Sequence, residues 1–318
     1  MNKIKIGVIG AGVLGSYHIG KCLANPDVDF CGFYDRDDAR RLVVKEKFAV
    51  RAYSDTASLL AETGAVIIAT PASTHLDIAR QCLDRGKHLL IEKPLAASFA
   101  EGALLVERAG EKGTVLHVGH SEAFNATFIR LLAYEPRPRF IEVHRLANYS
   151  PRGTDVPVVL DLMVHDLQLI LRLCREEPRY DKIAATGVPV ISDDIDIANV
   201  RLLFPSGCVA NLTASRISAK RMRKIRVFAK DNYFSADLDK GELDHYFLTS
   251  VPVAGQGLPV AFKNEKTAPV DALEAELQAF IDEIKGKKNN AGVTGTEALT
   301  VLKVTDFILG QLSAGTLG

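Results

Sequence analysis

The chain has 318 residues, which is more than one ordinary hydrophobic core needs and is typical of two domains. Hydrophobic residues make up 47% of it and charged residues 25%, the balance of a folded globular protein. Its 39 basic and 39 acidic residues cancel, so it lacks the net positive charge that favours nucleic acids or anionic membranes. We therefore expect neither a nucleic acid nor a membrane as a partner; the motifs described below predict a small-molecule substrate instead.

The sequence shows no targeting or membrane-spanning signal. The apolar segment 4–9 follows the first residues directly, without the long apolar core and cleavage site of a signal peptide. No stretch approaches the roughly 20 apolar residues that a membrane-spanning helix needs. The five cysteines show no metal-like spacing and lie in segments typical of a core. We therefore expect no metal, reduced thiols and a cytoplasmic location.

The first 120 residues alternate between short apolar runs and stretches with helical periodicity. Nearly continuous apolar strands interleaved with helices are typical of a parallel sheet covered on both faces. We therefore predict the α/β class, with a Rossmann dinucleotide-binding domain over residues 1–120. The predicted strands are 4–9, 30–34, 65–69, 88–91 and 114–118, and the predicted helices are 16–24, 37–47, 54–60, 74–85 and 98–111.

From about residue 121 the pattern changes to longer, alternating strands, which predict a C-terminal α+β substrate domain over residues 121–318. Its large, mostly antiparallel open sheet would have helices on one face. The other face would need covering, so we expect a homodimer or homotetramer through this sheet. The last helix, at about 294–312, is expected to pack on the first domain. One further helix is predicted at 161–173, another from Asp271, and strands at 195–204, 209–215, 224–229, 233–238 and 242–248.

A glycine-rich segment, Gly10-Ala11-Gly12-Val13-Leu14-Gly15, lies between the first predicted strand and its helix. In this pattern the glycines allow a tight turn, a close approach of backbone amides to a pyrophosphate, and close packing of helix on strand. Asp35 follows 20 residues after Gly15, where a carboxylate accepts hydrogen bonds from ribose hydroxyls and repels a 2′-phosphate. Arg36 could stack on adenine or meet such a phosphate. We predict NAD as the cofactor, with NADP as the less favoured alternative.

Two further motifs follow the next two strands. Thr70 and Pro71, with His75 close behind, come after the strand at 65–69, and Glu92-Lys93-Pro94 comes after the strand at 88–91. Ligands bind at the carboxyl ends of strands in an open α/β sheet. The predicted cofactor-binding residues are therefore Gly10, Gly12, Val13, Leu14, Gly15, Asp35, Arg36, Thr70, Pro71, His75, Glu92 and Lys93.

Together these motifs resemble the glucose–fructose oxidoreductase, inositol dehydrogenase and MocA (Gfo/Idh/MocA) family of NAD(P)-dependent oxidoreductases. The resemblance covers essentially the whole chain, including the downstream segment from Asp161 to His165. In that family a lysine and a downstream histidine flank the reacting carbinol, with an aspartate nearby. This implies Lys93, His165 and Asp161 as catalytic residues. Residues four apart on a helix share a face, so Asp161 and His165 can point at one pocket.

Oxidation of a secondary alcohol needs a base for the hydroxyl proton and a nicotinamide held against the carbinol hydrogen. Histidine titrates near neutral pH, so His165 is the preferred base. Asp161 could orient His165 or raise its basicity. Lys93 would bind the same oxygen and stabilise developing negative charge, or share the proton relay.

Residues 119–125, 150–155 and 159–166 resemble the bacterial branch that acts on UDP-sugars, above all the UDP-N-acetylglucosamine 3-dehydrogenases. This implies NAD-dependent oxidation of the C3 hydroxyl to a 3-keto sugar nucleotide, which would feed amino-sugar precursors of lipopolysaccharide. Arg152 and Arg145 would offer bidentate donors to the diphosphate. The implied substrate-binding residues are Lys93, Glu122, Asn125, Arg145, Ser150, Arg152, Asp161 and His165.

Two other functions fit the same sequence. A dehydrogenase of a free sugar or polyol, as in the inositol dehydrogenase branch, differs by having no diphosphate requirement. A non-catalytic sensor of nicotinamide or sugar would use the fold without chemistry. Lys93 and His165 argue against the sensor, because it has no need for a proton relay.

Overall fold

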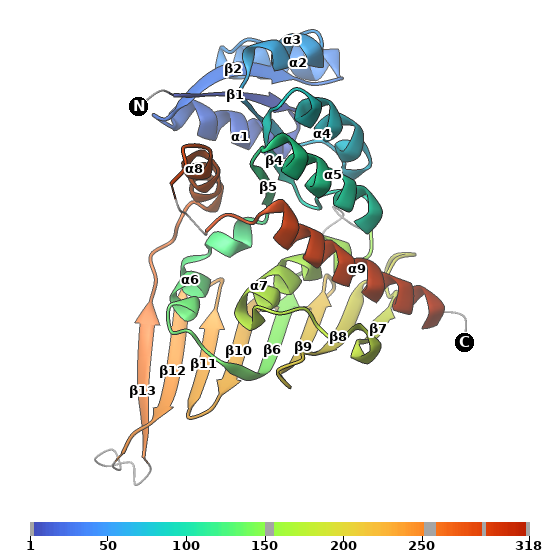
Figure 1. Cartoon of the computed structure of the whole chain (residues 1–318). Coiled ribbons are helices and arrows are strands. Elements are labelled where there is room, and N and C mark those ends of the chain that lie inside the picture. Colours follow the sequence, from blue (N-terminus) through green and yellow to red (C-terminus); the bar gives the residue numbers. More distant parts are fainter. Residues whose placement is uncertain (1–2, 150–155, 251–258, 288–290, 316–318) are drawn as a thin grey trace. The chain divides into compact units, whose positions relative to one another are not determined.

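The structure is a computed structural model that describes residues 3–149, 156–250, 259–287 and 291–315 (Figure 1). The chain forms two compact units. Unit 1 comprises Met1–Ser121 and Asp271–Leu302, and unit 2 comprises Glu122–Val270 and Lys303–Gly318. The sequence predicted one boundary near residue 120. It also predicted that the last helix, at about 294–312, packs on the first domain. In the structure the segment 271–302 belongs to unit 1, so the return begins earlier than predicted and includes only the first part of the last helix.

Unit 1 contains a five-stranded parallel sheet with the strand order β2-β1-β3-β4-β5. The predicted Rossmann-type α/β arrangement is therefore confirmed. Its strands are β1 (Ile4–Ile9), β2 (Val28–Tyr34), β3 (Ala65–Ile68), β4 (His88–Glu92) and β5 (Leu116–Gly119). Its helices are α1 (Val13–Ala24), α2 (Asp38–Phe48), α3 (Thr56–Glu62), α4 (His75–Asp84), α5 (Phe99–Lys112), α8 (Ala272–Ile284) and the first part of α9 (Gly295–Gly315).

Helix α8 completes the core of unit 1. Crossovers between parallel strands are right-handed, so α1, which connects β1 to β2, lies on the opposite face from α3, α4 and α5. On the α1 face, Leu277, Phe280 and Ile281 of α8 join Ile19 and Cys22 of α1 in one buried cluster. The amphipathic pattern after Asp271 therefore places its apolar face against α1.

Unit 2 contains an eight-stranded sheet with the order β13-β12-β11-β10-β6-β9-β8-β7 (Figure 1). Every neighbouring pair is antiparallel except β6 and β9, which are parallel, so the predicted large and mostly antiparallel sheet is confirmed. Its strands are β6 (Pro138–Leu146), β7 (Ala184–Val188), β8 (Ile197–Leu203), β9 (Val209–Ser215), β10 (Met222–Ala229), β11 (Asn232–Asp237), β12 (Glu242–Leu248) and β13 (Val260–Lys266).

Helices α6 (Ala126–Leu132) and α7 (Val164–Cys174) cover one face of this sheet (Figure 1). The sequence predicted a regular helix over 161–173. The structure instead begins it with a π-helical turn, Val159–Met163, because Val164 N–H also donates to Val159 O five residues back. None of the helices within the described ranges is long and apolar enough to cross a membrane.

The strands of unit 2 carry a ladder of contacting aromatic rings, which we call the aromatic ladder. It runs across β6, β10, β11, β12 and β13, with ring centroids 4.7 to 5.6 Å apart. Alternation along each strand places such residues on one face of the sheet. Several of the rings stay exposed, with Phe262 52% accessible. The members of the ladder are Phe140, Phe228, Tyr233, Tyr246 and Phe262.

Candidate active site

The loop between β1 and α1 requires glycine at two positions for packing. Gly10 has φ +89°, and a Cβ there would lie 2.5 Å from Ala69 O. A Cβ on Gly15 would lie 1.9 Å from Gly10 O, so only glycine lets α1 pack this closely on the turn. A Cβ on Gly12 would meet nothing within 4 Å. Gly12 is also the N-cap of α1, so this open side adjoins free helix N–H groups that attract phosphate.

Asp35 connects the end of β2 to this loop. Its side chain is 4% exposed, and Oδ2 accepts a hydrogen bond from Ala11 N–H at 2.7 Å. Oδ1 accepts another from Asp37 N–H at 2.9 Å. The Arg40 guanidinium lies 3.4 Å from Oδ2. Arg40 Nη1 also lies 3.5 Å from Oδ1, so the roughly four acceptor positions of this carboxylate are all in use. The two Arg40 contacts are the longest, so a ligand hydroxyl would bind Asp35 by displacing them.

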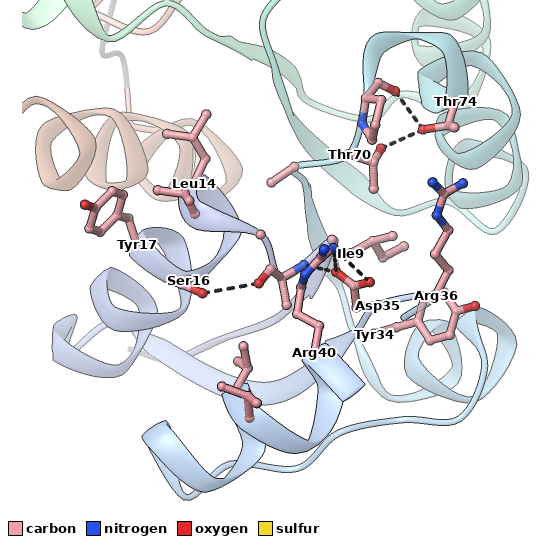
Figure 2. A pocket seen from close by; sticks show the side chains of 18 of the residues that line it. Ile9, Leu14, Ser16, Tyr17, Tyr34, Asp35, Arg36, Arg40, Thr70 and Thr74 are labelled. Atoms are coloured by element: carbon pink, nitrogen blue, oxygen red, sulfur yellow. Dashed lines mark hydrogen bonds and ion pairs between the residues drawn. The ribbon is translucent and has the colours of Figure 1, made fainter. Parts of the chain in front are cut away.

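A cavity of about 880 Å³ lies over the loop, within unit 1 (Figure 2). Small-molecule and cofactor sites commonly measure about 300 to 1,000 Å³. Figure 2 shows Asp35 beside Arg40, with Thr70 and Thr74 joined by a hydrogen bond of 2.8 Å. Of the predicted cofactor-binding residues, the cavity is lined by Gly10, Gly12, Val13, Leu14, Asp35, Arg36, Thr70 and Pro71.

Three cationic side chains also line this cavity, and they matter for the choice of cofactor. Arg36 was anticipated from the sequence, whereas Arg40 and Lys47 of α2 were not. Both residues lie on α2, which begins at Asp38, three residues after Asp35, with Asp37 as its N-cap. Asp35 supplies the one carboxylate among the cavity-lining residues. Its negative charge disfavours a 2′-phosphate, whereas the three positive charges would attract one.

His75 does not line the cavity. It is fully buried, and its Nδ1 lies 2.9 Å from Pro94 O while its Nε2 lies 2.8 Å from Thr70 O. The ring therefore connects the main chain of the Thr70-Pro71 motif with that of the Glu92-Lys93-Pro94 motif. Its predicted contact with the cofactor has no support in these hydrogen bonds.

Glu92 and Lys93 differ although they are neighbours at the end of β4. The Glu92 carboxylate is buried and accepts a hydrogen bond of 2.7 Å from His18 Nε2 of α1. Lys93 is half-buried, and the Lys93–Pro94 peptide bond is cis. The motif therefore sends one side chain into the core of unit 1 and leaves the lysine partly accessible.

The two other predicted catalytic residues belong to unit 2. Asp161 lies in the π-helical turn, and His165 lies in the first turn of α7. Both are half-buried, which suits side chains that must reach a ligand. Asp166, the next residue, points instead into the interior, where it is 2% exposed.

Arg145 is tied into a buried ion-pair network of unit 2. Its guanidinium is 3% exposed and donates to both oxygens of Asp166, at 2.9 and 3.0 Å. It also contacts Glu122, which in turn pairs with Arg223 at 2.8 Å. Burial works against the charge of Arg145, but the Asp166 and Glu122 carboxylates outweigh it and raise its pKa above the usual value. These contacts leave the predicted roles of Arg145 and Glu122 toward a substrate without support.

Asn125 serves as the N-cap of α6. Its Oδ1 accepts from Thr127 N–H and Phe128 N–H, and its amide donates to Leu238 O at 3.0 Å. All of these contacts are structural, so the predicted sugar contact is not supported. Ser150 and Arg152 lie outside the described residues.

Sequence reasoning missed two residues that the fold brings to Glu92. His18 lies on α1 and Glu276 on α8, and both are buried. A lone histidine or glutamate within an apolar helix carries no distinctive signal. Only the packing of three elements far apart in sequence reveals this cluster.

Comparisons with known proteins agree with this geometry. Residues 4–120 match the model of an oxidoreductase family described as Gfo/Idh/MocA, with an NAD-binding Rossmann fold. A UDP-N-acetylglucosamine 3-dehydrogenase from Acidithiobacillus ferrooxidans is 36% identical over 89% of this chain and 90% of its own. A myo-inositol 2-dehydrogenase from Thermotoga maritima is 25% identical over 74% of this chain and 75% of its own.

The solved structure of the Acidithiobacillus ferrooxidans enzyme superposes with a TM-score of 0.90 at 33% identity and covers 99% of both chains. The sequence match and the structural match thus extend over nearly the whole chain, across both units. The resemblance predicted from the motifs is confirmed. The chain belongs to the Gfo/Idh/MocA family of NAD-binding oxidoreductases.

Proposed function

We propose that the protein catalyses the NAD-dependent oxidation of the C3 hydroxyl of a UDP-sugar, of the UDP-N-acetylglucosamine type, to a 3-keto sugar nucleotide. The observation that supports this most strongly is the 36% identity, over 89% of the chain, with an enzyme named for that reaction. Such a product would be a substrate for transamination, on the way to amino-sugar precursors of lipopolysaccharide.

The described residues of unit 1 fit the cofactor. Gly12 leaves open the space that a Cβ would fill, next to the amino-terminal end of α1 where a pyrophosphate binds well. Asp35 can accept hydrogen bonds from the two ribose hydroxyls in place of its long contacts with Arg40, and its charge disfavours a 2′-phosphate. NAD supplies the hydride acceptor when it is bound. We therefore propose NAD as the preferred cofactor over NADP.

The chemical roles follow from the residue types. His165 takes the hydroxyl proton, since an imidazole accepts and releases protons near neutral pH. Lys93 donates hydrogen bonds to the same oxygen and stabilises its negative charge as the proton leaves. Asp161, one helical turn before His165, orients the imidazole and favours its protonated form.

A second candidate is the oxidation of a free polyol. The similarity to the Thermotoga maritima myo-inositol 2-dehydrogenase favours it, at lower identity. A polyol lacks the diphosphate, so its oxidation would not depend on a diphosphate-binding arginine such as the predicted Arg152. The two proposals therefore differ in one outcome: removal of the UDP group abolishes turnover under the first proposal but not under the second.

The deciding experiment incubates the protein with NAD and, in separate reactions, UDP-N-acetylglucosamine, its uronic acid and myo-inositol. NADH fluorescence and mass spectrometry are followed together, because an unfavourable equilibrium can hide the NADH signal. A product two hydrogens lighter from UDP-N-acetylglucosamine alone supports the proposal, and oxidation of inositol alone supports the second candidate. Bound NAD with no product from any of the three would favour a sensor.

Variants test the assigned roles. Lys93→Ala and His165→Ala are expected to lower kcat by a factor of about 100 or more, while the Kd for NAD changes little. Lys87→Ala is a matched control, because Lys87 lies just before β4 and bonds to Thr63 O. Full turnover in either variant would remove that residue from the mechanism.

We also propose that a second copy of the chain covers the aromatic ladder, giving a homodimer or homotetramer in the cytoplasm. Exposed rings such as Phe228 and Phe262 leave apolar surface in contact with water unless another surface covers them. Light scattering on Phe262→Glu is expected to show a smaller particle than wild type. An unchanged mass would contradict assembly through this face.

A further inference from the structure

Three titratable side chains meet in the core of unit 1, and the proposed mechanism uses none of them. His18 of α1, Glu92 of β4 and Glu276 of α8 each place one polar atom within 4.8 Å of the other two. Their exposed fractions are 0%, 9% and 2%. Burying this many ionisable groups is unfavourable unless they are paired or neutral. The cluster therefore calls for a functional explanation.

Glu276 is the unusual member of this cluster. Both of its carboxyl oxygens lack a hydrogen-bond partner in the described part of the chain. The groups that face it are His18 from α1 and the Glu92 carboxylate from β4. Burial, and next the negative charge of Glu92, raise the pKa of Glu276 well above its usual value. Both causes favour the uncharged form of Glu276, which lies beside the hydrogen-bonded pair of His18 and Glu92.

The cluster adjoins Lys93 through the main chain. Glu92 immediately precedes Lys93, and its carboxylate has little room to move. It pairs in register with Gly119 of β5, where a Cβ would lie 2.9 Å from Glu92 Oε2. On the other side of the lysine, His75 holds Pro94 O at 2.9 Å. Buried groups thus fix the residues before and after Lys93.

We propose that His18 and Glu276 are positioning residues for Lys93. His18 fixes the Glu92 carboxylate, and Glu276 fills the remaining space as a neutral acid, so no second negative charge enters the core. The anchored Glu92 sets the direction in which the main chain leaves β4, and hence the place of the lysine amine. The inference rests on the proposed function, in which this amine binds the alcohol oxygen.

A buried divalent cation is the competing explanation, because one imidazole nitrogen and two carboxylate oxygens suit zinc. His18 Nε2 and Glu92 Oε1 approach to 2.7 Å, the distance of a direct hydrogen bond. Two ligands that each lie about 2.0–2.2 Å from one tetrahedral zinc ion are farther apart than that. The geometry therefore favours a proton between these atoms.

The first test needs no substrate. Chemical unfolding of wild type and Glu276→Gln is measured from pH 5 to 9, with metal analysis of the purified protein. A carboxyl group whose pKa is higher in the folded than in the unfolded protein stabilises the fold at pH values below its unfolded pKa. This stabilisation is lost as the pH rises through the folded pKa. Relative to Glu276→Gln, the wild-type unfolding constant should therefore increase by up to about tenfold per pH unit above pH 5. If the unfolding free energies of wild type and Glu276→Gln change in parallel with pH, or if the protein contains one equivalent of bound zinc, Glu276 does not carry the proposed proton.

The second test addresses Lys93 directly. His18→Ala and Glu276→Ala are expected to lower kcat at least tenfold with less than twofold change in the KM for NAD. Glu276→Gln, a neutral isostere, should stay within threefold of wild type. Glu283→Gln is the matched control, since Glu283 of the same helix pairs with another histidine, His117, at 2.7 Å. Unchanged kcat in both alanine variants, with normal NAD affinity, would overturn the positioning role.

A third readout separates this inference from the proposed function. Peptide mass spectrometry measures the rate at which a small acylating reagent modifies Lys93, in the presence of NAD and without substrate. The rate should change at least threefold in His18→Ala and remain at the wild-type value in Glu276→Gln. Equal rates in all variants would overturn the inference even if no tested sugar is oxidised. A changed rate with no turnover of any sugar would leave the positioning role standing and refute the function alone.

Discussion

Replacing Asp35 by serine should shift the cofactor preference of this protein from NAD toward NADP. Asp35 is the carboxylate in a cavity that Arg36, Arg40 and Lys47 also line. Two of its acceptor positions are used by Ala11 N–H and by a neighbouring main-chain amide, at 2.7 and 2.9 Å. The other two meet Arg40 Nη1 at 3.5 and 3.4 Å, and we expect the two hydroxyls of a ribose to replace these long contacts. Serine is shorter and uncharged, so it cannot replace these contacts.

The size of the effect follows from those contacts. A hydrogen bond to a charged group contributes about 1.5 kcal/mol or more, so two lost bonds weaken NAD by about 3 kcal/mol, or roughly 100-fold. For NADP, the change also removes a repulsion of about 3 kcal/mol, for unit charges about 5 Å apart at an effective dielectric constant of about 20. The Ala11 N–H loses its partner for both cofactors, so this contribution cancels in their ratio. The ratio of NAD to NADP affinity should therefore fall by at least about 100-fold.

The assay is isothermal titration calorimetry, in which NAD and NADP are each titrated into wild type, Asp35→Ser and Asp38→Ser. Asp38 is a suitable control because it begins α2, is exposed and pairs only with Arg41 among the ion pairs of the described chain. The control should keep the wild-type ratio. A wild-type ratio in Asp35→Ser, with both proteins folded by circular dichroism, would refute the assignment of Asp35 to the ribose.

Three further predictions concern stability and the loop. Gly15→Ala should lower the melting temperature, because its Cβ would lie 1.9 Å from a main-chain oxygen. Gly12→Ala should melt like wild type but bind NAD at least tenfold more weakly in the same calorimetric titration. Burial opposes the charge of Asp196, but main-chain N–H groups and Arg216 outweigh it and hold the pKa of Asp196 well below the usual value. Asp196→Asn should therefore destabilise by about 3 kcal/mol at pH 7, and the difference from wild type should shrink below pH 4 in urea unfolding curves. Asp271→Ala removes the N-cap of α8 and should destabilise by about 1 kcal/mol in the same curves; no change would mean that the cap is not used.

Local patterns in the sequence were sufficient for the parallel sheet of unit 1 and for its cofactor loop, but they did not place α8 in this unit. Alternation of apolar strands with amphipathic helices predicts a parallel sheet, because such strands must be covered on both faces. The glycine spacing predicts the loop, since Gly10 and Gly15 occupy positions where a Cβ would collide with the main chain. Asp35 was identified in the same way, from its distance along the chain after the loop. These signals depend on residues that are near one another in the sequence, so the order of residue types along the chain is enough to reveal them.

Tertiary packing decided which polar side chains face a ligand and which are used inside the fold. Arg145 and Asn125 have the chemistry of ligand-binding residues, yet one is held by buried carboxylates and the other caps α6. The cluster of His18, Glu92 and Glu276 forms only because α1, β4 and α8 pack together, although 258 residues separate its first and last members. A side chain's partners in space depend on how distant elements pack, and no spacing along the chain records that.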